Sequence, residues 1–435
     1  MSDASRGTGW RGIALASSGN FLEMYDFMVF GFYAAPLSRG MFPGGNGFIA
    51  LMLALTTFGA GFLMRPIGAV VLGAYLDRYG RRKGLLLTLS LMAFGTVTIA
   101  VMPPYARIGL AAPILILLGR LVQGLSAGVE VGGVSVYLAE IAPPERRGFY
   151  VAWQSGSQQV AVIFAAALGI ALSLSLSPAA MLDWGWRIPF VIGCLLVPFL
   201  FLARRNMVET PAFMARGSRP DFREVARSLR SAWPLVALGT MLTAMTTVSF
   251  YLITVFTPTF GTTVLHLSAA VSLTVALCIG LSNFILLPVM GALSDRVGRP
   301  PLLRGAALAG LLTSYPALVW LVDGPSFGRL LAVGLWLSAV YAAYNGALIV
   351  FLTEMMPPTA STSGFSLAYS LATAIFGGFT PAICTFLIHR TGNRAMPGLW
   401  LSGAAFVAFL AATMAGRLLD LRACRRGDGN AAAVR

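Results

Sequence analysis

The chain has 435 residues, of which 57% are hydrophobic and 11% are charged, and its formal net charge is +15. Soluble domains hold about 45–50% apolar and about 25% charged residues, so this composition excludes an ordinary soluble domain. It favours a protein that has the lipid bilayer as its solvent. The positive charge does not indicate binding to nucleic acid, because the basic residues are spread along the chain instead of being gathered on one domain.

Apolar stretches separated by short polar loops predict twelve membrane-spanning helices, since about 20 apolar residues in a helix cross the hydrocarbon core. We place the spans near residues 13–37, 48–75, 84–103, 108–141, 149–176, 186–203, 233–260, 267–292, 301–322, 328–356, 363–389 and 397–417. The first span already contains Glu23 and Asp26, and no clear small-residue cleavage site follows it, so we interpret it as a retained span and not as a signal peptide. The sequence therefore predicts an all-α integral membrane protein.

The basic loop residues predict the orientation of the chain in the membrane. Twelve spans put both termini on one side, and that side holds most of the loop arginines, including Arg82, Arg147, Arg205 and Arg299. The opposite side keeps only scattered charges such as Arg107. Because cytoplasmic loops carry an excess of Lys and Arg, we predict that both termini are cytoplasmic.

Two loop motifs occur twice, about half a chain apart. Gly-Ala-Tyr-Leu-Asp-Arg-Tyr-Gly-Arg-Arg at 73–82 recurs as Gly-Ala-Leu-Ser-Asp-Arg-Val-Gly-Arg-Pro at 291–300. Glu-Ile-Ala-Pro-Pro at 140–144 recurs as Glu-Met-Met-Pro-Pro at 354–358. Transporter folds commonly arise by duplication, so the shared offset predicts that the chain consists of two related halves.

These halves define the predicted domain organisation. An N-terminal six-helix half occupies 1–203, and a C-terminal six-helix half with a basic cytoplasmic tail occupies 233–435. The segment between them, 204–232, is rich in arginine and has no run long enough to span, so it is predicted to be a cytoplasmic linker. Parallel halves related by an axis along the membrane normal leave a cavity between them.

The loop at 73–83 resembles the signature of the major facilitator superfamily, a Gly-x-x-x-Asp-Arg-x-Gly-Arg-Arg sequence between the second and third helices. A first set of further motifs resembles the metabolite:proton symporter family. This set comprises Ser18-Gly-Asn20-Phe-Leu-Glu23-Met-Tyr-Asp26-Phe27, Gly61-Phe-Leu-Met-Arg65-Pro66-Ile-Gly68, Gly119-Arg120-Leu-Val-Gln123-Gly124, Gly128-Val-Glu130-Val-Gly-Gly133 and Trp184-Gly-Trp186-Arg187-Ile-Pro189. A second set, at 149–160, 245–247, 257–259 and 374–381, resembles the citrate and tricarballylate members of that family.

The resemblance extends over nearly the whole chain and implies a major facilitator fold, with twelve helices in two pseudo-symmetric six-helix halves. It further implies a secondary active transporter of the bacterial inner membrane that takes up a tricarboxylate, citrate or tricarballylate, together with protons by alternating access. Relatives that carry osmolytes share the first set of motifs, so a proton symporter for betaine or proline is the alternative. A membrane sensor that keeps the fold without moving solute is a further alternative.

The repeated charged loops predict a gate at the cytoplasmic rim. Asp77, Arg78 and Arg81 lie in the first half, and Asp295 and Arg296 lie in the second. These residues can form charge pairs between helices that hold one conformation closed. Such pairs contribute more when the closing halves exclude water from them.

Ionisable residues within the spans indicate proton coupling, because each costs at least about 2.5–3.5 kcal/mol in the bilayer core and needs a partner or a function. Glu23 and Asp26 lie on one face of the first helix, where repulsion between two carboxylates favours protonation of one of them. Arg120 on the fourth helix is the expected counter-charge, in an Arg-x-x-Gln-Gly context that resembles the proton-coupling motif of the superfamily. Glu130 is either a second proton site or a packing partner of Arg65. The alternative to a proton-responsive network is a permanent ion-pair cluster that fixes helix packing.

A polycarboxylate ligand requires positive charge and hydrogen-bond donors in the cavity. The predicted substrate-binding residues are Asn20, Arg65, Arg120, Gln154, Gln158, Thr246, Tyr251, Tyr344 and Asn345. Arginine suits a carboxylate because its planar fork bonds both oxygens, and polar side chains recur at helical spacing on the fifth and seventh spans. A single Thr in a membrane helix more often bonds its own backbone, so the prediction depends on the concentration of donors.

The sequence has no His-Glu-x-x-His, Gly-x-Ser-x-Gly or ATP-binding Gly-x-x-x-x-Gly-Lys-Ser/Thr motif, which argues against an enzyme and favours transport driven by an ion gradient. Two repeated halves with charged loops favour alternating access over a channel. The four cysteines show no metal-ligand spacing. We therefore expect no metal site and no cofactor, and a monomer whose partners are a tricarboxylate anion, protons and the lipid bilayer.

Overall fold

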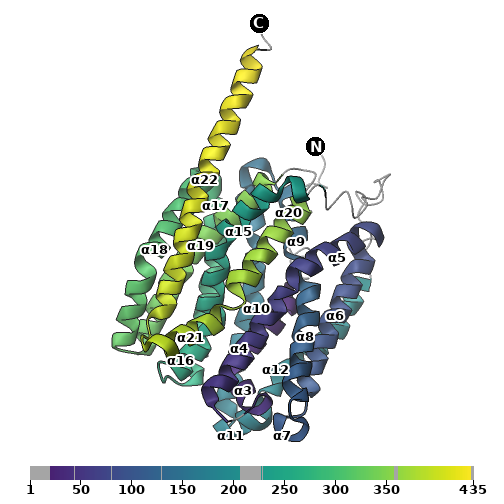
Figure 1. Ribbon diagram of the computed structural model, residues 1–435, viewed down its shortest axis with the longest axis vertical. Helices are drawn as coiled ribbons and strands as arrows, with labels where there is room; N and C mark the ends of the chain where they lie inside the picture. Colours follow the sequence, from purple (N-terminus) through teal and green to yellow (C-terminus); the bar gives the residue numbers. More distant parts are fainter. Residues whose placement is uncertain are drawn as a thin grey trace, which may run out of the picture.

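The computed structural model is a bundle of long helices that run side by side (Figure 1). It describes residues 20–43, 45–79, 81–128, 130–205, 227, 229–356 and 361–432. Within these residues, nine helices are long and apolar enough to cross a membrane, or ten if the bent pair Pro178–Gly185 and Arg187–Phe199 forms one span. Leu86–Val101 is a shorter apolar helix. These elements are consistent with the twelve predicted spans, the first of which is described from Asn20 onward.

The elements up to residue 205 follow the first six predicted spans. They are α2 (Asn20–Phe32), α3 (Ala34–Met41), α4 (Gly47–Leu63), α5 (Arg65–Tyr79), α6 (Arg81–Val101), α7 (Tyr105–Ile108), α8 (Ala111–Ala127), α9 (Glu130–Ile141), the 3-10 turn η2 (Pro144–Arg146), α10 (Arg147–Ser175), α11 (Pro178–Ala180), the π-helical η3 (Met181–Gly185) and α12 (Arg187–Arg205). Several predicted spans therefore consist of two consecutive helices, as α4 and α5 do over the second span.

The elements from residue 233 follow the last six predicted spans. They are α15 (Trp233–Phe250), η4 (Tyr251–Phe256), α16 (Thr257–Thr263), α17 (Ala269–Val297), α18 (Arg299–Asp323), α19 (Phe327–Met355), α20 (Ser361–Ala372), η6 (Thr373–Gly377), α21 (Thr380–Thr391) and α22 (Met396–Ala432). Both η4 and η6 are π-helical and interrupt the seventh and eleventh spans. Such segments are frequent at functional sites.

The predicted linker at 204–232 falls largely on residues 206–226 and 228, which lie outside the described residues. The described chain on either side consists of α12, which ends at Arg205, and α15, which begins at Trp233. The division of the chain into two halves and a linker therefore stays a prediction.

Local sequence signals explain where several helices begin and end. The side chain of Asn46 accepts a hydrogen bond from the backbone N–H of Phe48 at 2.9 Å, and that of Ser268 accepts one from Val271 at 3.2 Å. Each side chain satisfies an amide group that the first helical turn leaves without a partner. Helix α17 ends at Val297 and is followed by Gly298, whose φ of 92° lies in a region that glycine adopts without strain.

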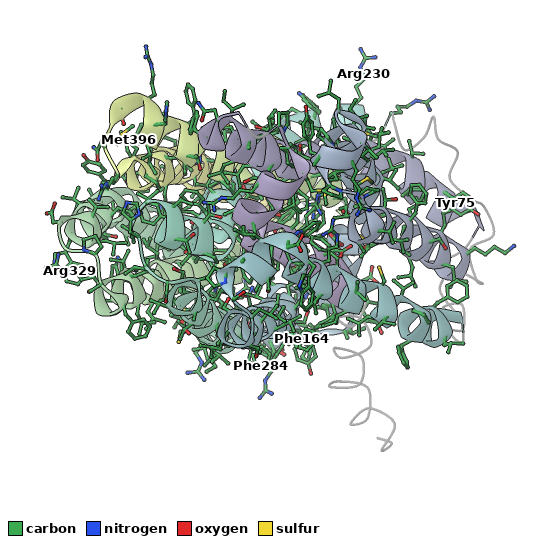
Figure 2. All side chains as sticks on the ribbon, turned by 90° about the horizontal axis from the view of Figure 1, so that it is seen from below. Tyr75, Phe164, Arg230, Phe284, Arg329 and Met396 are labelled. Carbon is green, nitrogen blue, oxygen red and sulfur yellow. The ribbon has the colours of Figure 1, made fainter. Side chains whose placement is uncertain are left out.

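The outer surface of the bundle is apolar, as a lipid environment requires. Figure 2 looks at the bundle from below and shows Phe164 at its edge, where this residue is 41% exposed. Leu312 and Phe199 are 63% and 72% exposed. In water such side chains would add up to large apolar patches, whereas lipid tails are as apolar as the side chains themselves.

Glycines let α8 cross α4 and α5 with the backbones in contact. A Cβ atom on Gly124 would lie 1.7 Å from the carbonyl oxygen of Gly61, and one on Gly68 would lie 1.9 Å from the carbonyl oxygen of Leu125. No larger residue fits without moving a helix, because the obstacle in each case is backbone. Small residues of this kind allow close approach of membrane helices, and here they hold the middle of α8 against α4 and α5.

The predicted halves meet at both ends of the bundle. Where α17 ends and α10 begins, Asp295 accepts hydrogen bonds from the backbone N–H groups of Gly148 at 2.8 Å and Phe149 at 3.0 Å. At the opposite end, the ring of Phe48 on α4 stacks on the ring of His389 on α21, with the centroids 3.7 Å apart. The bundle is therefore closed between α10 and α17 at one end and between α4 and α21 at the other.

Replacing Gly124 with alanine is expected to destabilise the bundle, because the new Cβ would collide with the backbone of Gly61. Overpacking costs about 1–3 kcal/mol where the neighbours can shift. The measurement is the melting temperature of the purified protein in detergent, which should fall. Gly133→Ala is the matched control, since a Cβ at Gly133 meets no atom within 4 Å. Equal melting temperatures of the two variants would contradict the close crossing of α8 and α4.

Candidate functional site

Four ionisable side chains of the predicted spans are buried together. Glu23 and Asp26 come from α2, Arg65 from α5 and Arg120 from α8, and each residue is at most 5% exposed. We call these four residues the charge cluster. The formal charges of its two acids and two arginines cancel. The sequence predicted all four as site residues, and the structure groups them through the contacts described below.

Glu23 pairs directly with Arg65. The Oε1 atom of Glu23 lies 2.9 Å from Nη2 of Arg65, and the side chains are 5% and 4% exposed. Removing one partner of such a buried pair costs about 3–5 kcal/mol, because the other charge is then left uncompensated. Arg65, for which the sequence suggested Glu130 as a packing partner, is thus held by Glu23.

Asp26 is held by uncharged donors and not by an arginine. Its Oδ2 accepts hydrogen bonds from the hydroxyl of Thr96 and from Nε2 of Gln123, the latter at 2.7 Å. Its Oδ1 has no hydrogen-bond partner among the described residues, although Asp26 is only 1% exposed. A buried carboxylate oxygen without a donor is costly, so Oδ1 is the oxygen at which a proton would be best accommodated.

Arg120 is fully buried and bonds an amide. Its Nη1 donates to Oε1 of Gln123 at 2.8 Å, while Nε and Nη2 have no hydrogen-bond partner in the described part of the chain. Nε and Nη2 share one edge of the guanidinium group, and such an edge can bind both oxygens of a carboxylate. The sequence predicted Arg120 as the counter-charge of the carboxylates, and the structure links it to Asp26 through Gln123.

Phenylalanine rings surround the two guanidinium groups. The ring centroid of Phe27 lies 4.7 Å from Cζ of Arg65 and 4.4 Å from Cζ of Arg120. Phe62 lies 4.5 Å from Cζ of Arg65, and Phe58 lies 5.3 Å from Cζ of Arg120. Each such cation–π contact contributes about 0.5–2 kcal/mol, with the larger values where water is excluded. The rings therefore stabilise the positive charges in a place that offers few hydrogen-bond acceptors.

Several predicted substrate-binding residues have polar atoms without partners. Nε2 of Gln154, Oγ1 of Thr246 and both amide atoms of Asn345 lack a hydrogen-bond partner within the described residues, and these residues are at most 1% exposed. Gln158 is also buried, at 7% exposure. An unsatisfied buried group costs about 1–3 kcal/mol, so each needs an explanation. A polar ligand or water molecules would satisfy them.

The two predicted tyrosines differ in what they contact. The hydroxyl of Tyr344 donates to the carbonyl oxygen of Leu242 at 2.7 Å, so it joins α19 to α15 and is not a free donor. The ring of Tyr251, on η4, packs edge-on against Phe62 with the centroids 5.1 Å apart. Tyr251 thus connects the predicted C-terminal half to the rings around Arg65.

Asp295, one of the predicted gate residues, joins the two predicted halves. Besides the N–H groups at the start of α10, it contacts Arg299 at 2.9 Å, and Arg299 also lies 3.3 Å from Glu354. Helices α10 and α17 cross at the same place with their backbones in contact at Gly148 and Gly291. A Cβ on Gly148 would lie 2.3 Å from the carbonyl oxygen of Gly291. The contacts between the halves here are thus made by a carboxylate and by backbone.

For several other predicted site residues, the structure does not describe the side chain. The side chains of Asn20, Asp77, Arg78, Arg81 and Glu130 lie outside the described residues, so their roles stay predictions. The side chain of Arg296 is exposed. The ion pairs beside Asp295 are made by Arg299 and Glu354, which the sequence analysis did not select as gate residues.

Sequence reasoning also missed residues of the charge cluster. Gln123 stands in the motif at 119–124 and could have been selected because it lies one helical turn from Arg120. Thr96 and the rings of Phe27 and Phe62 carry no comparable signal, because a threonine or a phenylalanine in a membrane helix is common. Their roles follow only from which helices lie together.

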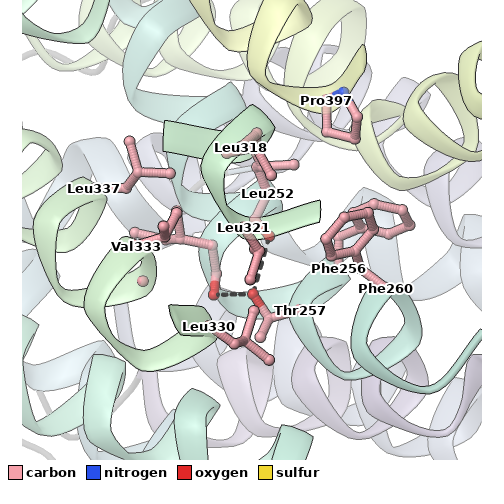
Figure 3. Close-up of a pocket in the computed structure, with 12 residues that line it drawn as sticks. Leu252, Phe256, Thr257, Phe260, Leu318, Leu321, Leu330, Val333, Leu337 and Pro397 are labelled. Carbon is pink, nitrogen blue, oxygen red and sulfur yellow. Dashed lines mark hydrogen bonds between the residues drawn. The ribbon is translucent and has the colours of Figure 1, made fainter. Parts of the chain in front are cut away.

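A cavity in the predicted C-terminal half does not include the charge cluster (Figure 3). Its volume is about 30 Å³, and its lining consists of Leu252, Ile253, Phe256, Thr257, Phe260, Leu318, Leu321, Leu330, Val333, Gly334, Leu337 and Pro397. The hydroxyl of Thr257 donates to the carbonyl oxygens of Leu252 and Ile253. The cavity has room for about one water molecule and is lined by no charged residue, so it is not a site for an anion.

Comparison of the sequence with curated proteins finds relatives over almost the whole chain. A citrate-proton symporter of Salmonella typhi is 54% identical over 410 residues, which make up 94% of each chain. A citrate-proton symporter of Klebsiella pneumoniae is 57% identical over 399 residues, or 92% of this chain and 90% of the relative. A proline/betaine transporter of Escherichia coli (strain K12) is 31% identical over 92% of this chain and 82% of its own.

Solved structures and a family model agree with these relatives. The xylose transporter XylE from E. coli, in a partially occluded inward open conformation, matches with a TM-score of 0.75 at 18% identity over 94% of this chain and 98% of its own. FucP in the outward conformation matches with a TM-score of 0.62 at 17% identity, over 93% and 98% of the two chains. These identities bear on the fold alone. The model described as Major Facilitator Superfamily matches residues 16–381, which confirms the resemblance seen in the motifs. The chain is therefore a multi-pass membrane protein that belongs to the Major Facilitator Superfamily.

Proposed function

We propose that the protein is a symporter that takes up a tricarboxylate such as citrate together with protons across a bacterial inner membrane, with both termini in the cytoplasm. Two relatives named as citrate-proton symporters support this proposal, because their identity exceeds one half over at least 90% of each chain. The structural observation that carries it is the edge of Arg120 formed by Nε and Nη2, which is buried and has no hydrogen-bond partner among the described residues.

A carboxylate is the group that this edge of Arg120 would bind. A buried guanidinium without acceptors is costly, and a carboxylate offers two oxygens at the spacing of Nε and Nη2. Gln154, Thr246 and Asn345 are buried polar residues with unpaired atoms, and they would serve the remaining carboxylate and hydroxyl groups. Tyr251 packs on the ring of Phe62, which itself contacts the guanidinium group of Arg65.

Proton coupling follows from charge balance. The cluster of Glu23, Asp26, Arg65 and Arg120 is neutral when both acids are ionised, so an arriving polycarboxylate would add uncompensated negative charge. A proton on Asp26 removes one negative charge beside Arg120 and favours binding of the anion. Binding of the anion must then favour uptake of the proton by the same factor, since coupling free energies are reciprocal.

Alternating access would use the two contacts between the predicted halves. Opening on one side requires that Asp295 release the first turn of α10, and opening on the other requires that Phe48 and His389 separate. Each contact closes one end of the bundle, and in this mechanism the two ends open in turn. The cluster would thus be reached from one side at a time.

The proposal is tested by uptake of labelled citrate into proteoliposomes that contain the purified protein. Acidification of the outside is expected to drive accumulation of citrate above the external concentration, and a protonophore should abolish it. Excess unlabelled betaine and proline should not compete. Uptake of betaine in place of citrate would support the osmolyte alternative, and citrate binding without any accumulation would support a sensor.

Substitution of Arg120 by lysine is expected to raise the KM for citrate about 10- to 100-fold. A lysine keeps the charge but cannot bond two carboxylate oxygens in parallel, and a hydrogen bond to a charged group is worth about 1.5–3 kcal/mol. The measurement is the citrate concentration that half-saturates exchange in proteoliposomes. Arg304→Lys is the control, because Arg304 is exposed and bonds the carbonyl oxygen of Pro300. An unchanged KM in the Arg120 variant would exclude it from the substrate site.

Substitution of Asp26 by asparagine is expected to abolish accumulation driven by a pH gradient while citrate exchange continues. The amide cannot bind and release the proton, but it keeps an oxygen that accepts from Thr96 and Gln123. Accumulation under a pH gradient and exchange at equal pH are measured in the same vesicles. Asp183→Asn, at an exposed position, serves as the control. Accumulation by the Asp26 variant at the level of the natural sequence would remove Asp26 from proton coupling.

A further inference from the structure

Gln123 joins Asp26 to Arg120. Its Nε2 donates to Oδ2 of Asp26 at 2.7 Å, and its Oε1 accepts from Nη1 of Arg120 at 2.8 Å. Gln123 is fully buried, so bulk water does not compete for either bond. The acid and the arginine are therefore connected through the two ends of one amide.

The charges at its two ends determine which way this amide points. A carboxylate accepts hydrogen bonds and a guanidinium donates them, so the amide nitrogen must face Asp26 and the amide oxygen must face Arg120. A reversed amide would place oxygen against oxygen and N–H against N–H. Both bonds are assisted by charge, which makes them about twice as strong as bonds between neutral groups. The strength with which the amide is held thus depends on the negative charge of Asp26.

The packing around Gln123 holds its stem in place. A Cβ atom on Gly95 of α6 would lie 2.4 Å from Cγ of Gln123, so the absence of a side chain at Gly95 makes room for this stem. The backbone oxygen of Gln123 accepts from the hydroxyl of Ser126 at 2.7 Å. Because the stem cannot shift freely, a change at Asp26 acts on the amide group and, through it, on Arg120.

We propose that Gln123 is a positioning residue that transmits the protonation of Asp26 to Arg120, an inference that rests on the proposed symport function. A proton from the outer solution adds to Oδ1 of Asp26 and forms an O–H bond, which removes the negative charge. The bond from Gln123 to Oδ2 then loses its charge assistance and weakens, so the amide is held less firmly. Arg120, which this amide holds at Nη1, can then move to a substrate carboxylate. Release of the proton to the cytoplasm restores the bridge.

Other titratable and charged groups face Asp26 and Arg120 from the surrounding helices. Tyr25 on α2 and Cys194 on α12 face Asp26, Arg65 on α5 and Tyr251 on η4 face Arg120, and Glu23 on α2 pairs with Arg65. Glu23 and Arg65 neutralise each other, and the hydroxyl of Tyr25 donates to the carbonyl oxygen of Pro189 at 2.8 Å. The hydrogen bonds of the Gln123 amide go to Asp26, Thr96 and Arg120. Of these titratable groups, Asp26 is therefore the one whose protonation changes a hydrogen bond of the Gln123 amide.

The test compares Gln123→Met with the natural sequence in proteoliposomes. Methionine fills a similar volume but cannot bridge the acid and the arginine. The KM for citrate exchange is measured at acidic and at neutral pH, together with accumulation under a pH gradient. The natural protein is expected to have a lower KM at acidic pH. The methionine variant should continue to exchange citrate with equal KM values at both pH values, and its accumulation should fall at least about tenfold.

Gln123→Glu is the second variant, and it separates positioning from packing. Glutamate keeps an acceptor for Arg120 but places a second carboxyl group against Oδ2 of Asp26, so the two acids must share a proton. One negative charge then stays beside Arg120 at both pH values, so the KM should be raised at both, with a ratio near one. Leu118→Ala, on the same helix and 50% exposed, is the control and should keep the pH dependence of KM. If Gln123 only supports the fold, both Gln123 variants should have lower melting temperatures, and the ratio of KM at acidic pH to KM at neutral pH should stay as in the natural protein. That result would overturn the inference.

The outcomes also separate this inference from the proposed function. If the natural protein accumulates citrate and the methionine variant keeps its pH dependence and its accumulation, the inference on Gln123 alone is wrong. If the methionine variant does not fold, the glutamate variant decides by the same KM ratio. If the natural protein neither exchanges nor accumulates citrate, both the proposed symport function and the inference on Gln123 are wrong.

Discussion

The placement of two acids and two arginines inside an apolar bundle is the constraint on which the rest of this structure depends. A charge in this environment is tolerated only with a partner, and Glu23 and Asp26 find their partners on other helices. Glu23 therefore ties α2 to α5, and Asp26 ties α2 to α6 and α8 through Thr96 and Gln123. The same bonds that fix these helices make the cluster sensitive to the arrival of a proton or an anion.

The cluster depends in turn on backbone contacts that have no chemistry of their own. Glycines on α4, α5 and α8 bring these helices close enough for side chains of ordinary length to reach across. Gly95 does the same between α6 and α8, where it leaves space for the stem of Gln123. The phenylalanine rings then fill the volume beside the guanidinium groups and exclude water from them. Packing and charge thus determine one arrangement together.

Much of the fold could be predicted from the sequence, because apolar length and loop charge act locally along the chain. The breaks within spans were not predicted, although the π-helical turn at Tyr251–Phe256 comes directly before Thr257-Pro258, where proline lacks the N–H of a regular helix. For the site, the spacing of Glu23 and Asp26 predicted acids on one helix but not their partners. Which arginine faces which acid depends on the rotation of α5 and α8, which one sequence does not reveal. Tyr344 was predicted as a donor to substrate, yet its hydroxyl is bonded to a neighbouring helix.

The two closed ends of the bundle differ in the forces that close them. Asp295 caps the first turn of α10, which carries about half a positive charge, and Arg299 and Glu354 extend this contact toward the surface. The opposite contact, between Phe48 and His389, consists of stacked rings. Dissolved ions weaken attraction between exposed charges, but the side chains of Asp295 and Arg299 are only 6% and 13% exposed. Salt would therefore act at the rim of this end, on Glu354, and leave both the capped helix turn and the stacked rings largely unchanged.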